Sequence, residues 1–349
     1  MKIQKERIIW IDALNIVACM GVLLLHCTNG EIHNFRGQVS TEWMIGLITH
    51  STFLWPVNVF FMLSGFTLLR QNSSNGTGGV MQFYKRKLNR LLIPVLFWNT
   101  LYMMQQLFAQ WNKGNLLDSP TVIVEKFLSF QYNGFMWFFI PLISIYLSLP
   151  FLSIFVLNAQ RSILRTFIIL AVALNCIASF QSNFSSRMEY FDVYLFGSRF
   201  IVFAVAGYYM GTYTIRKATR KILYLSALAC VTLMLVGTIV LQYHAPQHYK
   251  YFIQYVNFPC TIISFAVFLF FKHTDWKGFM QRWKIESRTL LSLSSLSLGI
   301  YLVQLVGFLV VNHIPFVSNI SILKFLTMYI GCALVVWTLK HIPVLKKLV

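Results

Sequence analysis

Long apolar segments alternate with short polar or basic ones along almost the whole chain. Each apolar segment is roughly 20 residues long, the length that an α-helix needs to cross a hydrocarbon core. We predict about ten membrane-spanning helices, with ends good to about two to four residues, over residues 8–27, 44–69, 88–108, 135–157, 162–180, 190–212, 222–242, 251–271, 290–312 and 320–339. An even number places both termini on one side of the membrane.

Composition excludes a soluble globular protein, because 57% of the residues are hydrophobic and only 11% are charged. The fold class predicted is therefore an all-α, polytopic integral membrane protein. No linker or change in composition divides the chain, so residues 1–349 are expected to form a single transmembrane domain. The first apolar segment is read as a retained helix and not as a signal peptide.

The basic residues predict the orientation of the helices. Of the 29 Lys and Arg residues, 22 fall on one set of connections and five on the opposite set. By the positive-inside rule both termini of this multi-pass protein lie in the cytoplasm. The net charge of +19 then reflects topology and requires no nucleic-acid partner.

Polar residues recur at helical spacing in the first apolar segment, at Asp12, Asn15, Cys19, Val22 and His26. Intervals of three and four residues place them on one narrow stripe of a helix. A carboxylate in a membrane segment is costly unless it faces the bundle interior, so we expect the stripe to line a polar interior path. The ordinary alternatives are a capping aspartate and a packing histidine, whereas catalysis would use the imidazole as acid or base.

Three further arginines are candidate functional residues: the pair Arg86 and Arg90, and Arg199. Arg86 and Arg90 are four residues apart at the start of the third segment, where guanidinium groups can either bind phosphates or anchor a helix end. Arg199 lies about nine residues into the sixth predicted span. A cation at that depth is expected to face a cavity or an acidic partner such as Asp192 or Asp12.

The ninth segment carries a row of polar residues, Ser297, Tyr301 and Gln304, which could equally be a packing seam. The six cysteines show no paired or metal-ligand spacing, so neither a disulfide framework nor a metal site is expected.

Taken in order, these residues resemble the acyltransferase family 3, membrane-bound enzymes of which many O-acetylate bacterial surface polysaccharides. The resemblance rests on the first-segment Asp and His followed by FFMLSGF (60–66), KRKLNR (85–90), MWFFIPLISIYLSLP (136–150), FAVAGYYMG (203–211) and SLGIYL (297–302). It covers nearly the whole chain.

The resemblance implies that His26 is the catalytic base and that Arg86 and Arg90 hold the acyl-CoA phosphates. Asp12 and Asn15 are assigned to the same catalytic group, where Asp12 could orient Asn15 or pair with Arg199. Trp137 matches the WFF stretch of the family, and together with Tyr301 and Gln304 it is expected at the substrate.

Three positions depart from the family pattern. Many members have Arg or Lys where this chain has Asn15, a histidine before the WF motif where it has Phe135 and Met136, and a histidine where it has Gln304. Our hypothesis is that Arg199 replaces the missing first-helix cation and contributes to the cofactor site.

The expected function is transfer of an acyl group, most simply acetyl, from cytoplasmic acetyl-CoA or another acyl-CoA to a hydroxyl of a cell-surface glycan or its lipid-linked precursor. Acyl-CoA is a co-substrate, and no bound cofactor or metal is expected. Two other classes fit the same pattern. A transporter or flippase for a glycan or lipid-linked precursor would also use an internal polar stripe, and a structural or sensory membrane protein would not depend on His26.

Overall fold

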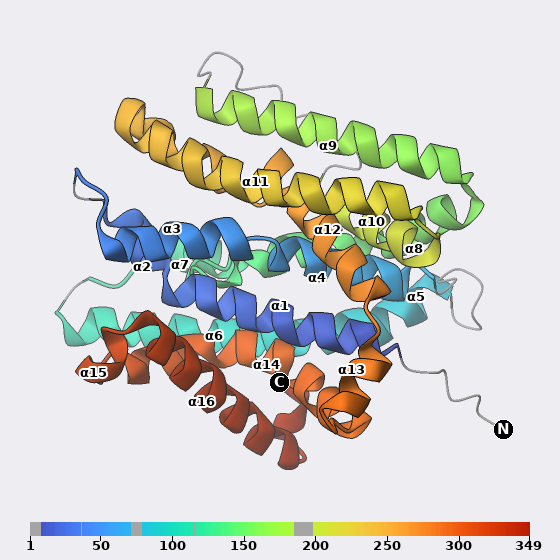
Figure 1. Cartoon of the computed structure of the whole chain (residues 1–349). Coiled ribbons are helices and arrows are strands. Elements are labelled where there is room, and N and C mark those ends of the chain that lie inside the picture. Colours follow the sequence, from blue (N-terminus) through green and yellow to red (C-terminus); the bar gives the residue numbers. More distant parts are fainter. Residues whose placement is uncertain (1–7, 36, 71–78, 115, 185–197) are drawn as a thin grey trace. The chain divides into compact units, whose positions relative to one another are not determined.

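Helices make up the regular secondary structure of this protein, as the computed structural model shows (Figure 1). The structure describes residues 8–35, 37–70, 79–114, 116–184 and 198–349. Asp192 and the basic residues of the first seven positions lie outside these ranges. The described residues contain no β-strand, so the predicted all-α class is confirmed.

Eight helical segments of the described residues are long and apolar enough to cross a membrane. They are Ile9–Cys27, Thr41–Leu68, Gly79–Asn112, Met136–Asn158, Arg161–Gln181, Lys217–His244, Ser287–Val311 and Ser321–His341. Two shorter apolar helices, Ile201–Thr212 and Phe258–His273, fall where the sixth and eighth spans were predicted. A polytopic integral membrane protein is therefore confirmed, whereas a total of ten spans stays a prediction.

The chain divides into two compact units. Unit 1 comprises residues 1–71 and 155–297, and unit 2 comprises residues 72–154 and 298–349. The boundaries fall inside helix α8 (Phe139–Asn158) and inside helix α14 (Ser287–Val311). A single functional domain over the whole chain remains a prediction.

Unit 1 contains most of the helices, together with the last residues of α8 and the first part of α14. Its complete helices are α1 (Ile9–Cys27), α2 (Asn29–His33), α3 (Thr41–Phe53), α4 (Pro56–Leu68), α9 (Arg161–Phe184), α10 (Ile201–Thr212), α11 (Lys217–His244), α12 (Phe258–His273) and α13 (Trp276–Arg282). The long second apolar segment is broken at Leu54 and Trp55, and Pro56 opens α4, where its missing N–H costs nothing.

Close packing of α4 against α10 forms the centre of unit 1. Gly65 of α4 faces the backbone of Ala204, and Gly207 of α10 faces the backbone of Met62. A β-carbon at either glycine would overlap the opposing main chain. The small residues of FFMLSGF and FAVAGYYMG therefore let two apolar helices touch backbone to backbone, as in other membrane bundles.

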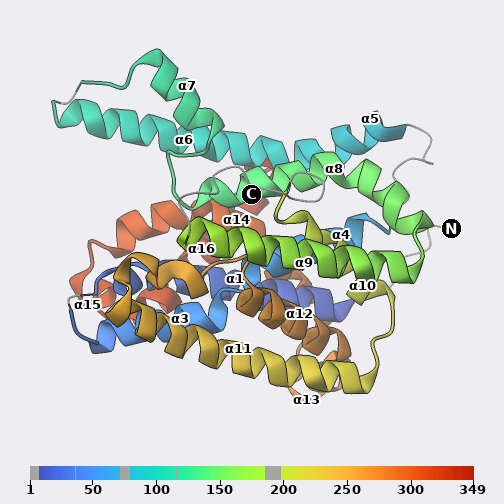
Figure 2. The ribbon, with the colours of Figure 1, turned by 90° about the horizontal axis from the view of Figure 1, so that it is seen from above.

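The remaining helices of unit 1 surround this pair. Helices α11 and α12 lie side by side in both ribbon views (Figures 1 and 2). At the start of α1, the ring of Trp10 lies 5.4 Å from that of Phe66 on α4 and 5.2 Å from that of Phe268 on α12. Lys272 donates hydrogen bonds to the carbonyls of Met210 (2.6 Å) and Tyr213 (3.0 Å), which joins the ends of α12 and α10.

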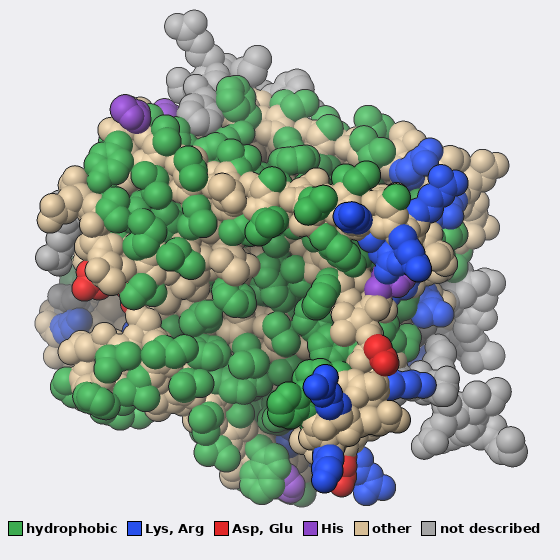
Figure 3. All heavy atoms as spheres, in the orientation of Figure 1, with side chains coloured by type: hydrophobic (Ala, Val, Ile, Leu, Met, Phe, Trp, Pro, Cys, Tyr) green, Lys and Arg blue, Asp and Glu red, His purple; other side chains and the backbone are tan. Residues whose placement is uncertain are grey.

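Basic side chains gather at one end of unit 1, where α9 and α11 begin and α12 ends (Figure 3). We call this the basic end. Helix α1 also begins there, so His26 in its last turn lies at the opposite end of the helix.

Unit 2 is built from α5 (Gly79–Phe83), a π-helical turn (Tyr84–Leu88), α6 (Asn89–Asn112), α7 (Pro120–Leu128), most of α8, the second part of α14, α15 (Pro315–Ser318) and α16 (Ser321–His341). Buried polar side chains join these helices. Trp98 donates to the carbonyl of Leu348 (2.8 Å), Asn99 to that of Phe127 (2.9 Å), and Tyr102 to that of Leu302. Side-chain hydrogen bonds to backbone oxygens thus fix α6 in this unit.

Candidate active site

The polar stripe of α1 starts in a cavity at the basic end of unit 1. Asp12 is only 6% exposed, and it belongs to the first turn of α1, where a carboxylate stabilises the positive end of the helix dipole. The cavity has a volume of ≈ 480 Å³. Its lining comprises Ile8, Ile9, Trp10, Asp12, Thr274, Asp275, Trp276, Lys277, Ser287 and Leu290. This end of the stripe therefore faces polar groups and not lipid.

The middle of the stripe packs against α14. Asn15 Nδ2 lies 2.8 Å from the carbonyl oxygen of Ser294, 3.0 Å from its Oγ and 3.2 Å from Ser297 Oγ. Cys19 Sγ lies 3.7 Å from the carbonyl oxygen of Ser297. The stripe thus faces the protein interior, as expected.

A polar path along this stripe stays a prediction. In the middle of the stripe, the Asn15 amide is bonded to two serines of α14. Val22, one turn beyond Cys19, is 3% exposed. The amide and the two hydroxyls satisfy one another in the bundle, so these polar residues form a helix–helix contact.

Replacing Asn15 by leucine should lower the stability of the protein, because the serine acceptors on α14 would lose their donor. Interhelical hydrogen bonds in membranes contribute about 0.6 kcal/mol on average and up to about 1.7 kcal/mol. We expect a lower melting temperature in detergent for Asn15→Leu, and a smaller effect of the same substitution in a protein that already carries Ser297→Ala. Val17→Leu, about 200° away around α1, serves as the control and should leave the melting temperature nearly unchanged. Equal melting temperatures for Asn15→Leu and wild type would contradict the contact.

His26 lies in the last turn of α1, and its side chain is half-buried. The next residues, Cys27 and Thr28, are buried, and Thr28 Oγ1 donates to the carbonyl of Leu24 at 3.1 Å, which closes the helix end. A half-buried imidazole is partly accessible from outside the packed helices. An imidazole can accept a proton from a hydroxyl near neutral pH.

In unit 2, two of the motifs singled out from the sequence meet. The hydroxyl of Tyr301 on α14 donates to the carbonyl of Phe135, and its ring lies 5.5 Å from the ring of Phe138 and 5.4 Å from that of Phe139. SLGIYL therefore packs on MWFF. Trp137, in the same stretch, is half-buried.

Gln304 lies one turn beyond Tyr301 on α14 and is 1% exposed. Burial of an amide in an apolar bundle is costly unless its polar atoms are satisfied, so Gln304 requires polar partners inside the protein. Substrate binding by Trp137, Tyr301 and Gln304 stays a prediction.

Arg86 lies in the π-helical turn that precedes α6 of unit 2, and Arg90 lies in the first turn of α6. Both side chains are exposed. Arg86 belongs to the π-helical turn, in which Asn89 N–H bonds the carbonyl of Tyr84, five residues back. π-Helical turns are rare and are frequent at functional sites. The structure thus presents both guanidinium groups to solvent, where an anionic ligand can reach them.

Arg199 does not lie inside a helix, contrary to the sequence prediction. Helix α10 begins only at Ile201, and Arg199 occupies a turn before it. The Nδ2 atom of Asn175 on α9 donates to the Arg199 carbonyl at 2.9 Å. The predicted partner Asp192 lies outside the described residues. A role of Arg199 in place of a first-helix cation stays a hypothesis.

Two buried polar residues of unit 1 were missed by the sequence reasoning. His50 on α3 is 7% exposed, and its Nδ1 lies 2.9 Å from the carbonyl oxygen of Gly46. Asn58 on α4 is fully buried, and its Nδ2 lies 2.6 Å from the carbonyl oxygen of Tyr255 and 3.1 Å from Ser264 Oγ. Neither residue belongs to a periodic polar stripe, which is the signal that drew attention to α1.

Among the described residues, no group of three or more His, Cys, Asp or Glu side chains is placed so that it could hold a metal ion. The six cysteines all fall in the described ranges, and none of them forms a disulfide there.

Long apolar helices, backbone contacts at glycine and an inward polar stripe define a polytopic helical membrane protein. A family model described as an acyltransferase domain, Acyl_transf_3, matches residues 8–341, and the chain belongs to this family. The resemblance drawn from the motifs is thereby confirmed, and the protein is a membrane acyltransferase. No curated protein and no solved structure matches the chain.

Proposed function

We propose that this protein is an O-acyltransferase that moves an acetyl group from acetyl-CoA to a hydroxyl of a surface glycan or its lipid-linked precursor. The observation that carries the proposal is the family match along residues 8–341, together with a half-buried histidine at the end of an inward-facing stripe. The protein would reside in a bacterial cytoplasmic membrane with both termini in the cytoplasm.

The proposed reaction is an acyl transfer that balances without a further co-reactant. His26 accepts the proton of the acceptor hydroxyl while that oxygen attacks the thioester carbonyl. The carbon–sulfur bond then breaks, and the CoA thiolate leaves and takes up a proton. The products are an acetyl ester and free CoA.

Donor binding is assigned to Arg86 and Arg90 of unit 2. The CoA moiety carries several phosphate groups, and guanidinium groups bind phosphate oxygens through paired, charge-assisted hydrogen bonds. Asn15 fixes α1 against α14 through Ser294 and Ser297. Asp12, at the start of the same helix, lines the cavity at the basic end of unit 1.

The test of the activity uses the purified protein in proteoliposomes with radiolabelled acetyl-CoA and envelope glycan from cells that lack the protein. We expect CoA thiol to be released and an alkali-labile label to appear on the glycan. Glycan movement across the membrane without release of CoA would instead establish a transporter.

Removal of both donor-binding cations should weaken the use of acyl-CoA. For Arg86→Ala combined with Arg90→Ala we expect the KM for acetyl-CoA to rise by about tenfold or more, because charge-assisted hydrogen bonds contribute about 1.5–3 kcal/mol each. The kcat should change little. Lys85→Ala is the matched control, since Lys85 is an exposed cation in the same turn. An unchanged KM in the double variant would refute the assignment.

A further inference from the structure

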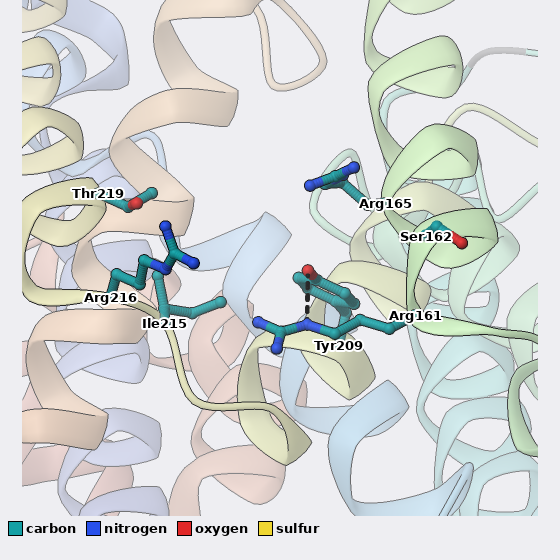
Figure 4. Close-up of a pocket in the computed structure, with 7 residues that line it drawn as sticks. All are labelled: Arg161, Ser162, Arg165, Tyr209, Ile215, Arg216 and Thr219. Carbon is teal, nitrogen blue, oxygen red and sulfur yellow. Dashed lines mark hydrogen bonds between the residues drawn. The ribbon is translucent and has the colours of Figure 1, made fainter.

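A second cavity at the basic end of unit 1 is lined by cations and hydroxyl groups. Its volume is ≈ 500 Å³. The lining consists of Arg161, Ser162 and Arg165 from α9, Tyr209 from α10, and Ile215, Arg216 and Thr219 at the start of α11 (Figure 4). Three guanidinium groups thus approach one space from two helices, and none of the described residues that line it is a carboxylate.

Arg161 is held in position by aromatic residues. Its Nε donates to the hydroxyl of Tyr209 at 3.2 Å and one terminal nitrogen donates to the carbonyl of Thr214 at 3.0 Å. The guanidinium carbon also lies 5.1 Å from the ring centre of Tyr213 and 5.7 Å from that of Tyr209. Because a guanidinium has five N–H donors, Arg161 retains further donors for a ligand while its plane is fixed.

Arg165 and Arg216 complete the cluster from opposite sides of the cavity (Figure 4). Within the described part of the chain neither side chain forms a hydrogen bond or an ion pair. Like charges around one cavity repel each other unless an anion lies between them. Unlike the carboxylate-lined cavity beside Asp12, this one offers positive charge alone.

Two helix ends add to the attraction for an anion. Helix α9 begins at Arg161 and α11 begins at Lys217, with Arg216 as its N-cap residue. Both helices are long, and their first N–H groups carry partial positive charge. Ser162 and Thr219 provide hydroxyl donors in the same first turns. Guanidinium groups, hydroxyls and helix N-termini together form the usual set of phosphate ligands.

We propose that this cavity binds a phosphate group, and that it is a site separate from Arg86 and Arg90. The surroundings favour the headgroup of an anionic phospholipid as the source. Ile163 on α9 and Ile222 and Leu225 on α11 are 49%, 65% and 60% exposed, so the N-terminal parts of the two helices that line the cavity also carry apolar surface for acyl chains. The same chemistry would also accept a phosphate of CoA, so the experiment must separate the two sources.

The test compares Arg165→Gln with Arg216→Gln, combined in one protein, against a control with Lys217→Gln and Lys221→Gln. Arg161 is left in place because it packs on two tyrosines. The control removes the same total charge, two positive charges, but takes both from α11 and leaves the lining intact. Binding of phosphatidylglycerol is measured by native mass spectrometry of the purified protein, and binding of CoA by calorimetry in phosphatidylcholine nanodiscs.

We expect the arginine variant to bind phosphatidylglycerol about tenfold or more weakly than the wild type, since each basic residue contributes about 1 kcal/mol to attraction of an anionic lipid. The control should bind nearly as well as the wild type, and CoA binding should be unchanged. A selective loss of CoA binding would support the phosphate site and assign it to the donor. Unchanged binding of both ligands would overturn the proposal. Neither measurement requires turnover, so the outcome does not depend on the proposed enzymatic activity.

Discussion

A His26→Ala protein is expected to lose acyl transfer by a factor of about 10²–10⁴, the usual contribution of a positioned general base. The hydroxyl of a sugar is a poor nucleophile until its proton is accepted, and His26 is the residue of the α1 stripe whose side chain can accept it at neutral pH. The amount of protein in the membrane should not change, because the side chain is only half-buried. The readout is release of CoA from acetyl-CoA that depends on the glycan acceptor.

Two further variants make this result specific. His26→Gln keeps a hydrogen-bonding side chain of similar size but cannot act as a base at neutral pH, so it should be as inactive as His26→Ala. The second variant, His33→Ala, removes an exposed histidine of α2 whose Nδ1 lies 2.8 Å from the hydroxyl of Tyr249. This variant should retain activity. Full activity of His26→Gln would show that His26 is not the general base.

Replacing Gly65 or Gly207 by leucine should prevent the protein from accumulating as a folded species. At both positions a β-carbon would overlap the main chain of the opposing helix, and a backbone cannot move aside as a flexible side chain does. Overpacking of a core costs about 1–3 kcal/mol even where side chains can yield, so a clash with backbone should cost more. The measurement is the fraction of protein that elutes as a single peak after detergent extraction.

Gly331→Leu is the matched control for this experiment. Gly331 also lies in an apolar helix, α16, but an added β-carbon there would meet no atom within 4 Å. We expect the control to elute like the wild type. Normal elution of Gly65→Leu would mean that α4 and α10 do not pack through their glycines.

Apolar length and the spacing of polar residues were enough to predict several features correctly. The eight long apolar helices follow from runs of about 20 apolar residues. The inward direction of the α1 stripe follows from the cost of exposing Asp12 and Asn15 to lipid, and the structure confirms it through the cavity at Asp12 and the contacts of Asn15 with α14.

Other features depend on contacts between distant segments, which spacing within one segment does not show. The sequence predicted Arg199 inside a helix, because the apolar run of the sixth segment does not show where α10 begins. The partners of Asn15 are an example, because Ser294 and Ser297 lie far away from it in the chain.

The arginine cavity illustrates the same limit. In the sequence, the only property assigned to Arg161, Arg165 and Arg216 was their contribution to membrane orientation. The positive-inside rule places each of them at a cytoplasmic loop. Their common cavity follows only from the packing of α9 beside α10 and from the turn that leads into α11.

The central claim is that an acyl group from cytoplasmic acetyl-CoA is transferred to a glycan hydroxyl with His26 as the base. The most direct measurement uses sealed inside-out membrane vesicles with radiolabelled acetyl-CoA outside and acceptor glycan enclosed. Our account predicts alkali-labile label on the enclosed glycan in wild-type vesicles, and none when His26 is replaced by glutamine. Equal labelling by the two proteins, or no labelling by an intact wild-type protein, would contradict it.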